Sequence, residues 1–154
     1  MKESKMTYVK KFSDVLKEIE KIGSKDNTIY IDGVNTILMS GKILKNIYNR
    51  NPTLRFSIRN TIKDFTIQDE KFYLDPNSYK FLKTCVAKYK KVIIVVLNKN
   101  NLNVNFKGVE LMNLHDLNCE NMEESSFAID CGCIDDRFLI CSQTKKLHII
   151  KIRT

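Results

Sequence analysis

The segment KVIIVVL, residues 91–97, decides the fold that the sequence predicts. Its apolar run does not alternate with polar residues, which is typical of a strand covered on both faces, as in a parallel sheet. The run is also far too short to span a bilayer. We therefore expect residues 91–97 to form the central strand of a mainly parallel sheet.

Helix and strand patterns alternate in the first third of the chain. Apolar residues recur at steps of three and four up to Gly23, which predicts one amphipathic packing helix. Residues 28–32, TIYID, predict a strand that stops at Gly33. Ser40 is a candidate N-cap for a second helix, which Pro52 prevents from continuing. The apolar stripe of the first helix comprises Val9, Phe12, Val15, Leu16, Ile19 and Ile22.

The middle of the chain is less regular. Residues 54–58, LRFSI, are a candidate short strand. Asp75 followed by Pro76 is typical of the start of a helix, the third of the chain. After the central strand, the alternation over residues 102–106 and the apolar run over 109–114 predict one or two further short strands.

The last part of the chain allows two interpretations. Residues 135–146 form a helix that is followed by a strand over 147–152, or residues 138–142 and 147–152 form a β-hairpin; periodicity alone does not separate them. The alternation of helices and strands predicts an α/β three-layer sandwich with helices on both faces of the sheet. We expect one domain, with a packing helix in residues 1–24 and the core in residues 28–154.

Length and charge narrow the class of protein. A chain of 154 residues is the size of one ordinary domain, and 43% hydrophobic with 29% charged residues is typical of a globular protein, not a disordered or fibrous one. The net charge of +8 favours a polyanionic partner such as nucleic acid, while a solvated lysine-rich surface is the alternative. We expect no membrane insertion.

The five cysteines include no CxxC pair, and no secretory signal precedes the first charged residues. We therefore expect reduced thiols in the cytoplasm or nucleus. A zinc site has little support, because the spacing fits no closed structural pattern. Its conceivable ligands are His115, Cys119, Cys131, Cys133 and His148.

Polar residues that suit chemistry occur in two places. Asp32 and Asn35 follow the predicted first strand, and ligands of open α/β sheets bind beyond the carboxyl ends of strands. A plain strand-end turn is the alternative, since Asp-Gly is a common turn signal. Asp135 and Asp136 stand where a helix begins, so they either cap that helix or bind Mg²⁺ or Mn²⁺, which prefer oxygen ligands.

Together these segments resemble a known family. YIDGVN, residues 30–35, is similar to the opening motif of NYN-domain ribonucleases, and CIDDRFLI, residues 133–140, is similar to their later Asp-Asp motif, especially in the Regnase-like branch. Protein-only RNase P has a related nuclease domain. The resemblance covers residues 28–154, with specific motifs only at its two ends, and implies a single PIN-like domain.

The resemblance implies a metal-dependent endoribonuclease with Mg²⁺ or Mn²⁺ as cofactor. Asp32, Asp135 and Asp136 correspond to the metal-binding carboxylates and Asn35 to the amide that supports them. Hydrolysis of an RNA phosphodiester would then use metal ions to activate water and stabilise charge. The basic candidates for RNA contact are Lys42, Lys45, Arg50 and Arg137.

One departure from the family pattern concerns Thr154, which stands where the family has a last acidic residue. Loss of a carboxylate weakens divalent metal binding. Either the site is degenerate, or Asp130 or Glu124 compensates, or the native chain extends further. A degenerate PIN-like module that binds RNA or a protein partner, including a second copy of the chain, is therefore the alternative function.

Overall fold

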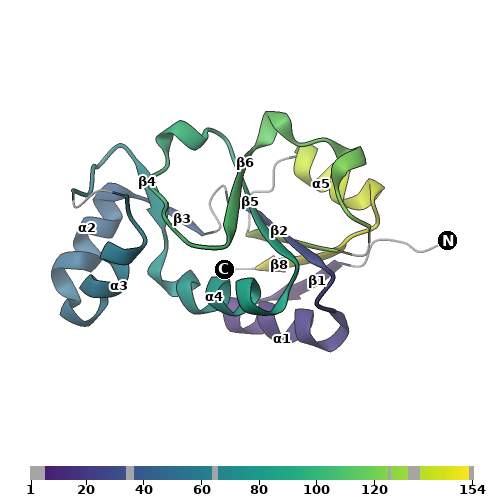
Figure 1. The fold of residues 1–154 in the computed structure, drawn as a ribbon, viewed down its shortest axis with the longest axis horizontal. Coiled ribbons are helices and arrows are strands. Elements are labelled where there is room, and N and C mark those ends of the chain that lie inside the picture. Colours follow the sequence, from purple (N-terminus) through teal and green to yellow (C-terminus); the bar gives the residue numbers. More distant parts are fainter. Residues whose placement is uncertain (1–5, 34–36, 64–65, 125, 132–135, 153–154) are drawn as a thin grey trace.

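The computed structural model describes residues 6–33, 37–63, 66–124, 126–131 and 136–152. A six-stranded parallel sheet in the order β1-β8-β7-β2-β5-β6 forms its centre, with helices on both faces (Figure 1). This confirms the predicted α/β three-layer sandwich. The strands are β1 (Met6–Val9), β2 (Thr28–Asp32), β5 (Lys91–Val96), β6 (Val109–Asn113), β7 (Phe127–Cys131) and β8 (His148–Ile152).

Helices α1 (Phe12–Ile22) and α4 (Tyr79–Lys88) cover one face of the sheet, and α5 (Asp136–Thr144) covers the other. Along β2, Ile29 and Ile31 pack under α1 and α4, while Tyr30 packs under α5. Strands β2 and β5 are therefore buried on both faces, which explains their unbroken apolar runs. Strand β5 is an interior strand as expected, although β7 and β2 form the middle of the sheet.

The order of the strands reverses direction at β2. The chain passes outward from β2 to β5 and β6, returns to β7 on the opposite side of β2, and then passes outward again to β8. The carboxyl ends of β2 and β7 therefore flank the topological switch point. In doubly wound α/β sheets this crevice is where ligands bind.

A separate lobe projects beyond the sheet at the left of Figure 1. This helical lobe comprises β3 (Leu38–Ser40), α2 (Gly41–Arg50), η1 (Pro52–Leu54), α3 (Arg55–Asn60) and β4 (Phe72–Leu74), with β3 antiparallel to β4. The Ser40 hydroxyl accepts a hydrogen bond from Ile43 N at 3.3 Å, which confirms the predicted N-cap. The lobe has its own apolar cluster, formed by Leu44, Ile58, Ile62, Ile67 and Tyr73.

Two predictions about elements are wrong. Val9 belongs to β1, where it pairs with Ile152, and not to the first helix. The LRFSI segment contributes to η1 and α3, because Leu54 and Ile58, one helical turn apart, share the apolar cluster of the lobe. Of the one or two further strands expected after β5, the structure has β6; residues 102–106 form no strand, although Leu102 makes an isolated bridge to Phe72.

The later elements follow the first interpretation of the sequence. Strands β7 and β8 are parallel and joined by α5, which rules out the hairpin. The Asp75 carboxylate accepts a hydrogen bond from Asn77 N at 2.9 Å and so caps η2 (Pro76–Ser78), which leads into α4. Short helices η3 (Lys99–Asn101), η4 (Leu114–Asp116) and η5 (Cys119–Asn121) complete the fold. No helix within the described ranges is long and apolar enough to cross a membrane.

Candidate functional site

Asp32 is the last residue of β2, and only 2% of its surface is exposed. Gly33 N donates to Val95 O at 2.7 Å and ties the end of β2 to β5. A Cβ atom on Gly33 would lie 2.8 Å from Ile94 Cγ2 and 2.9 Å from Val95 O. Glycine is thus required here by the close approach of β5, which holds Asp32 at a fixed point of the sheet edge.

Asp32 and Asp130 are neighbours at the switch point. Strands β2 and β7 are in parallel register up to Ile31 and Ile129, so the next residues along both strands are the two aspartates. Neighbouring strands lie about 4.8 Å apart. The residues two positions earlier face α5, and both carboxylates therefore point to that face. Asp130 has no exposed surface, so two buried carboxylates stand side by side.

Lys151 continues this row across the sheet. It pairs with Asp130 in the register of β7 and β8, and its Nζ lies 3.8 Å from Asp130 Oδ2. The Lys151 side chain is 22% exposed, whereas that of Asp130 is fully buried. On the other side of the row, Asp32 pairs with Val95. The order Lys151, Asp130, Asp32, Val95 therefore places a cation beside one of the two carboxylates.

The second motif lies at the start of α5, above the same face. Asp136 is the first residue of this helix, although its side chain is not among those described, and Asn35, Asp135 and Thr154 fall outside the described residues. The Arg137 guanidinium donates to Leu117 O at 2.6 Å and so ties α5 to the preceding loop. Its contact with RNA stays a prediction.

Glu124 and Asp130, the two acids expected to compensate for Thr154, lie at opposite ends of β7. Glu124 precedes β7 and is exposed. Its neighbour Glu123 accepts hydrogen bonds from Thr28 Oγ1 at 2.8 Å and Lys90 Nζ at 3.1 Å. Burial opposes ionisation of Glu123, but these two bonds together with the charges of Lys90 and Lys91 outweigh it and lower the pKa of the carboxyl. Because this cluster lies at the amino edge, Asp130 is the compensating acid that the fold brings to Asp32.

The donor set at this site suits a hard cation. Asp32 and Asp130 offer carboxylate oxygens, and the described residues contain no group of three or more His, Cys, Asp or Glu that could hold a metal. Mg²⁺ is commonly held by one or two carboxylates, with water and substrate phosphate filling the remaining positions. A pair of carboxylates fits that requirement and does not fit a closed zinc site.

The first half of the helical lobe carries a strong positive charge. Between residues 41 and 63 the sequence has no Asp or Glu, and its six basic residues are all exposed. Lys45 also pairs with Asp69 at 2.8 Å. Lys42, Lys45 and Arg50 were expected to contact RNA, whereas sequence reasoning missed the other three. The set is Lys42, Lys45, Arg50, Arg55, Arg59 and Lys63, which we call the basic face.

Aromatic side chains lie among these cations. The guanidinium carbons of Arg55 and Arg59 lie 5.5 and 5.6 Å from the centre of the Tyr48 ring. Arg55 also donates to Tyr48 O at 2.9 Å and Asn49 O at 3.1 Å, so it binds carbonyls at the end of α2 and joins the two helices. Phe56 between the two arginines is 76% exposed. Cations with interleaved aromatic rings are typical of surfaces that bind single-stranded nucleic acid.

The cysteines differ from the expectation of reduced thiols. Cys119 in η5 is bonded to Cys141 in α5, across 22 residues of sequence, because both pack into the cluster under α5. This pairing removes Cys119 from the conceivable zinc ligands. Cys85 is a free, buried thiol, and burial raises its pKa to about 12.

No protein-family model, curated protein or solved structure matches the chain. The likeness to NYN-domain ribonucleases therefore rests on the two short motifs and on their chemistry. Two features could have been found from the sequence but were missed: the absence of acids between residues 41 and 63, and the FAID segment of residues 127–130, which ends in Asp130 as TIYID ends in Asp32.

Proposed function

We propose that this protein is a Mg²⁺- or Mn²⁺-dependent endoribonuclease of the PIN-like type. The observation that carries the proposal is the pair of buried carboxylates, Asp32 and Asp130, at the switch point of a parallel sheet. Burying two adjacent acids is costly unless a cation or a proton offsets their charge. Such sites are concentrated where proteins use the charge for function.

The roles of the residues follow from their positions. Asp32 and Asp130 would hold the metal ion, with Asp135 and Asp136 as the further ligands that the sequence resemblance implies. When bound, this ion supplies an activated water and offsets charge that develops on the phosphate. Gly33 fixes Asp32 against β5. The α5 helix covers the same face, and the dipole at its amino end favours an anionic phosphate nearby.

The basic face supports RNA as the substrate. It holds six of the cations of a chain whose net charge is +8; the segment of residues 41–63 has no acid, and Asp69 pairs with one of the six, Lys45. Contacts with phosphates give most of the affinity of such surfaces and make binding sensitive to salt. Exchanging Lys42 and Arg50 for glutamate is therefore expected to weaken RNA binding and reduce its salt dependence. Lys25→Glu, an exposed change at the amino edge of the sheet, is the matched control.

The test of activity uses a labelled single-stranded RNA of mixed sequence. We expect Mn²⁺ or Mg²⁺ to support cleavage and EDTA to stop it. Asp32→Asn and Asp130→Asn are each expected to lower the rate at least about a hundredfold, and Asp136→Asn should do the same if the second motif supplies a ligand. Asp26→Asn changes an exposed aspartate at the amino edge and should leave the rate unchanged.

Cleavage that survives unchanged in Asp32→Asn would not depend on this site and would contradict the proposal. Circular dichroism and urea unfolding of each variant separate loss of the site from loss of the fold. Binding of RNA in EDTA, measured by fluorescence anisotropy, separates substrate binding from chemistry.

One observation favours the alternative, a degenerate module that binds RNA without cutting it. Lys151 Nζ stands 3.8 Å from Asp130 Oδ2 and offsets part of the charge that would otherwise attract a metal ion. RNA binding without cleavage under all metal conditions, together with no metal-induced rise in melting temperature, would support this alternative. Absence of both binding and cleavage would contradict both functions.

A further inference from the structure

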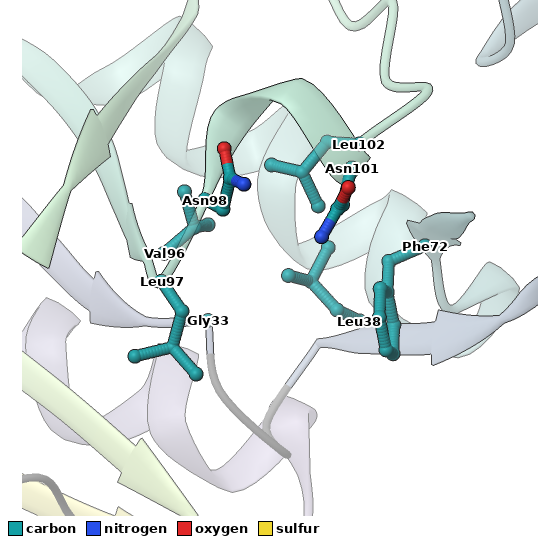
Figure 2. Close-up of a pocket in the computed structure, with 8 residues that line it drawn as sticks. All are labelled: Gly33, Leu38, Phe72, Val96, Leu97, Asn98, Asn101 and Leu102. Atoms are coloured by element: carbon teal, nitrogen blue, oxygen red, sulfur yellow. The ribbon is translucent and has the colours of Figure 1, made fainter. Parts of the chain in front are cut away.

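A pocket opens beside Gly33, between the sheet and the helical lobe (Figure 2). Its volume is about 260 Å³. One wall comes from the carboxyl end of β5 and the opposite wall from β3 and β4. The apolar lining residues are Leu38, Phe72, Val96, Leu97 and Leu102.

Two carboxamides stand on the rim of this pocket. Asn98 caps the short helix η3 and Asn101 is its last residue, and in Figure 2 the amide nitrogens of both point toward the space between the two walls. Asn98 Oδ1 accepts a hydrogen bond from Asn100 N at 2.9 Å, which turns its amino group the other way. Lys99 N donates to Asn113 Oδ1 at 2.8 Å and fixes η3 to the end of β6. The pocket therefore presents two amide donors above apolar walls.

We propose that this pocket binds one unpaired nucleobase of an RNA strand. A base is flat and apolar on its faces and carries hydrogen-bond acceptors on its edge, which matches the apolar walls and the amide groups of Asn98 and Asn101. Phe72, which is 43% exposed, offers an aromatic ring for stacking. The inference rests on the proposed function for the identity of the polymer to which the base belongs.

The position of the pocket along the fold supports this occupant. Gly33 lines the pocket and directly follows Asp32, whereas Leu38 is the first residue of β3, the strand that leads into α2 and the basic face. The pocket thus lies between the acidic site and the cationic helices. Its lining residues Leu38, Val96 and Leu102 belong to the cluster under α1 and α4, so a base held there would lie at the sheet edge next to Gly33, one residue beyond Asp32.

A gap filled by solvent is the competing interpretation, and free nucleotides distinguish the two. The intact protein is titrated in EDTA with adenosine 5′-monophosphate, uridine 5′-monophosphate and ribose 5-phosphate, and amide chemical shifts are followed by NMR. We expect the two nucleotides to shift signals of η3, Gly33 and β4 in a saturable manner. Ribose 5-phosphate, which lacks a base, should not.

Two variants test the proposed contacts. Phe72→Leu removes the ring but keeps an apolar side chain, and we expect it to weaken nucleotide binding about five- to tenfold. Asn101→Ala removes one amide donor and should weaken binding about fivefold. Asn100→Ala is the control, since Asn100 is exposed and binds Asn98 through its backbone, and should leave the affinity unchanged.

The outcomes separate this inference from the proposed function, because nucleotide binding is measured without metal and without cleavage. Nucleotide shifts confined to the pocket and weakened by Phe72→Leu support the inference even if RNA is never cut. Equal chemical-shift changes with ribose 5-phosphate, or nucleotide-induced changes that both variants leave intact, overturn the inference, even if the protein cleaves RNA with the help of Asp32.

Discussion

Replacing Lys151 with methionine tests how the protein tolerates two buried carboxylates side by side. Methionine keeps much of the apolar stem of lysine but removes the charge that lies 3.8 Å from Asp130 Oδ2. At this distance, with an effective dielectric constant of about 20, the attraction between two unit charges is about 4 kcal/mol. Some of it is lost in the wild type to desolvation of the lysine and to screening, since the Lys151 side chain is 22% exposed.

We therefore expect Lys151→Met to lower the free energy of unfolding by about 2–3 kcal/mol, near the lower end of the range for breaking a buried ion pair. For a chain of this length that corresponds to a fall in melting temperature of roughly 5–10 °C. The assay is urea and thermal unfolding in EDTA, followed by circular dichroism. Lys107→Met, at an exposed loop position, is the matched control and should leave stability unchanged.

A double-mutant cycle isolates the interaction. Asp130→Asn/Lys151→Met removes both charges, so we expect it to be more stable than Lys151→Met alone, with a coupling energy of at least about 1 kcal/mol. Adding Mn²⁺ should raise the melting temperature of Lys151→Met more than that of the wild type, because the metal then binds without a competing cation. If Lys151→Met costs no more than the Lys107 control and shows no coupling, Lys151 does not offset the charge of Asp130.

Two further predictions concern the frame of the site. Gly33→Ala places a Cβ atom 2.9 Å from Val95 O, so the end of β2 must shift, and we expect a loss of about 1–3 kcal/mol in urea unfolding; an unchanged midpoint would refute the close approach. Reduction of Cys119–Cys141, which closes a loop of 22 residues, should lower stability by about 3 kcal/mol. Unfolding with and without reductant measures this, and an equal effect of reductant on Cys119→Ser would rule out the bond as the cause.

The elements that could be predicted are those whose burial leaves a clear pattern in the sequence. TIYID and KVIIVVL are covered on both faces, so their apolar runs predicted β2 and β5. The wrong predictions arise where packing is non-local. Val9 fits the stripe of α1 by spacing, but the partner that makes it part of a strand is Ile152, more than a hundred residues away. Likewise, the LRFSI segment is helical because Leu54 and Ile58 pack into the apolar cluster of the lobe, whose other members lie elsewhere in the sequence.

The candidate site was predicted in part for the same reason. Asp32 could be placed because it ends a recognisable strand at a glycine. Asp130 was named only as a substitute acid, since no pattern in the sequence states which strand lies beside β2. Pairing across the switch point is decided by the whole order of the sheet. The role of Lys151 could not be predicted at all, because it depends on the register of β7 and β8.

The order of side chains across the sheet edge bears on whether Lys151 makes the site inactive. Lys151 lies beside Asp130, and Asp32 lies on the far side of Asp130 from it. A lysine in this place offsets the charge of one carboxylate and leaves Asp32 at the end of the row nearer β5 and the pocket. Mg²⁺ requires as few as one or two protein carboxylates when a phosphate is bound. The contact between Lys151 and Asp130 is therefore compatible with a metal ion bound to Asp32. On this argument Lys151 stabilises the free protein and competes with the metal ion for Asp130, while Asp32 stays available to the metal.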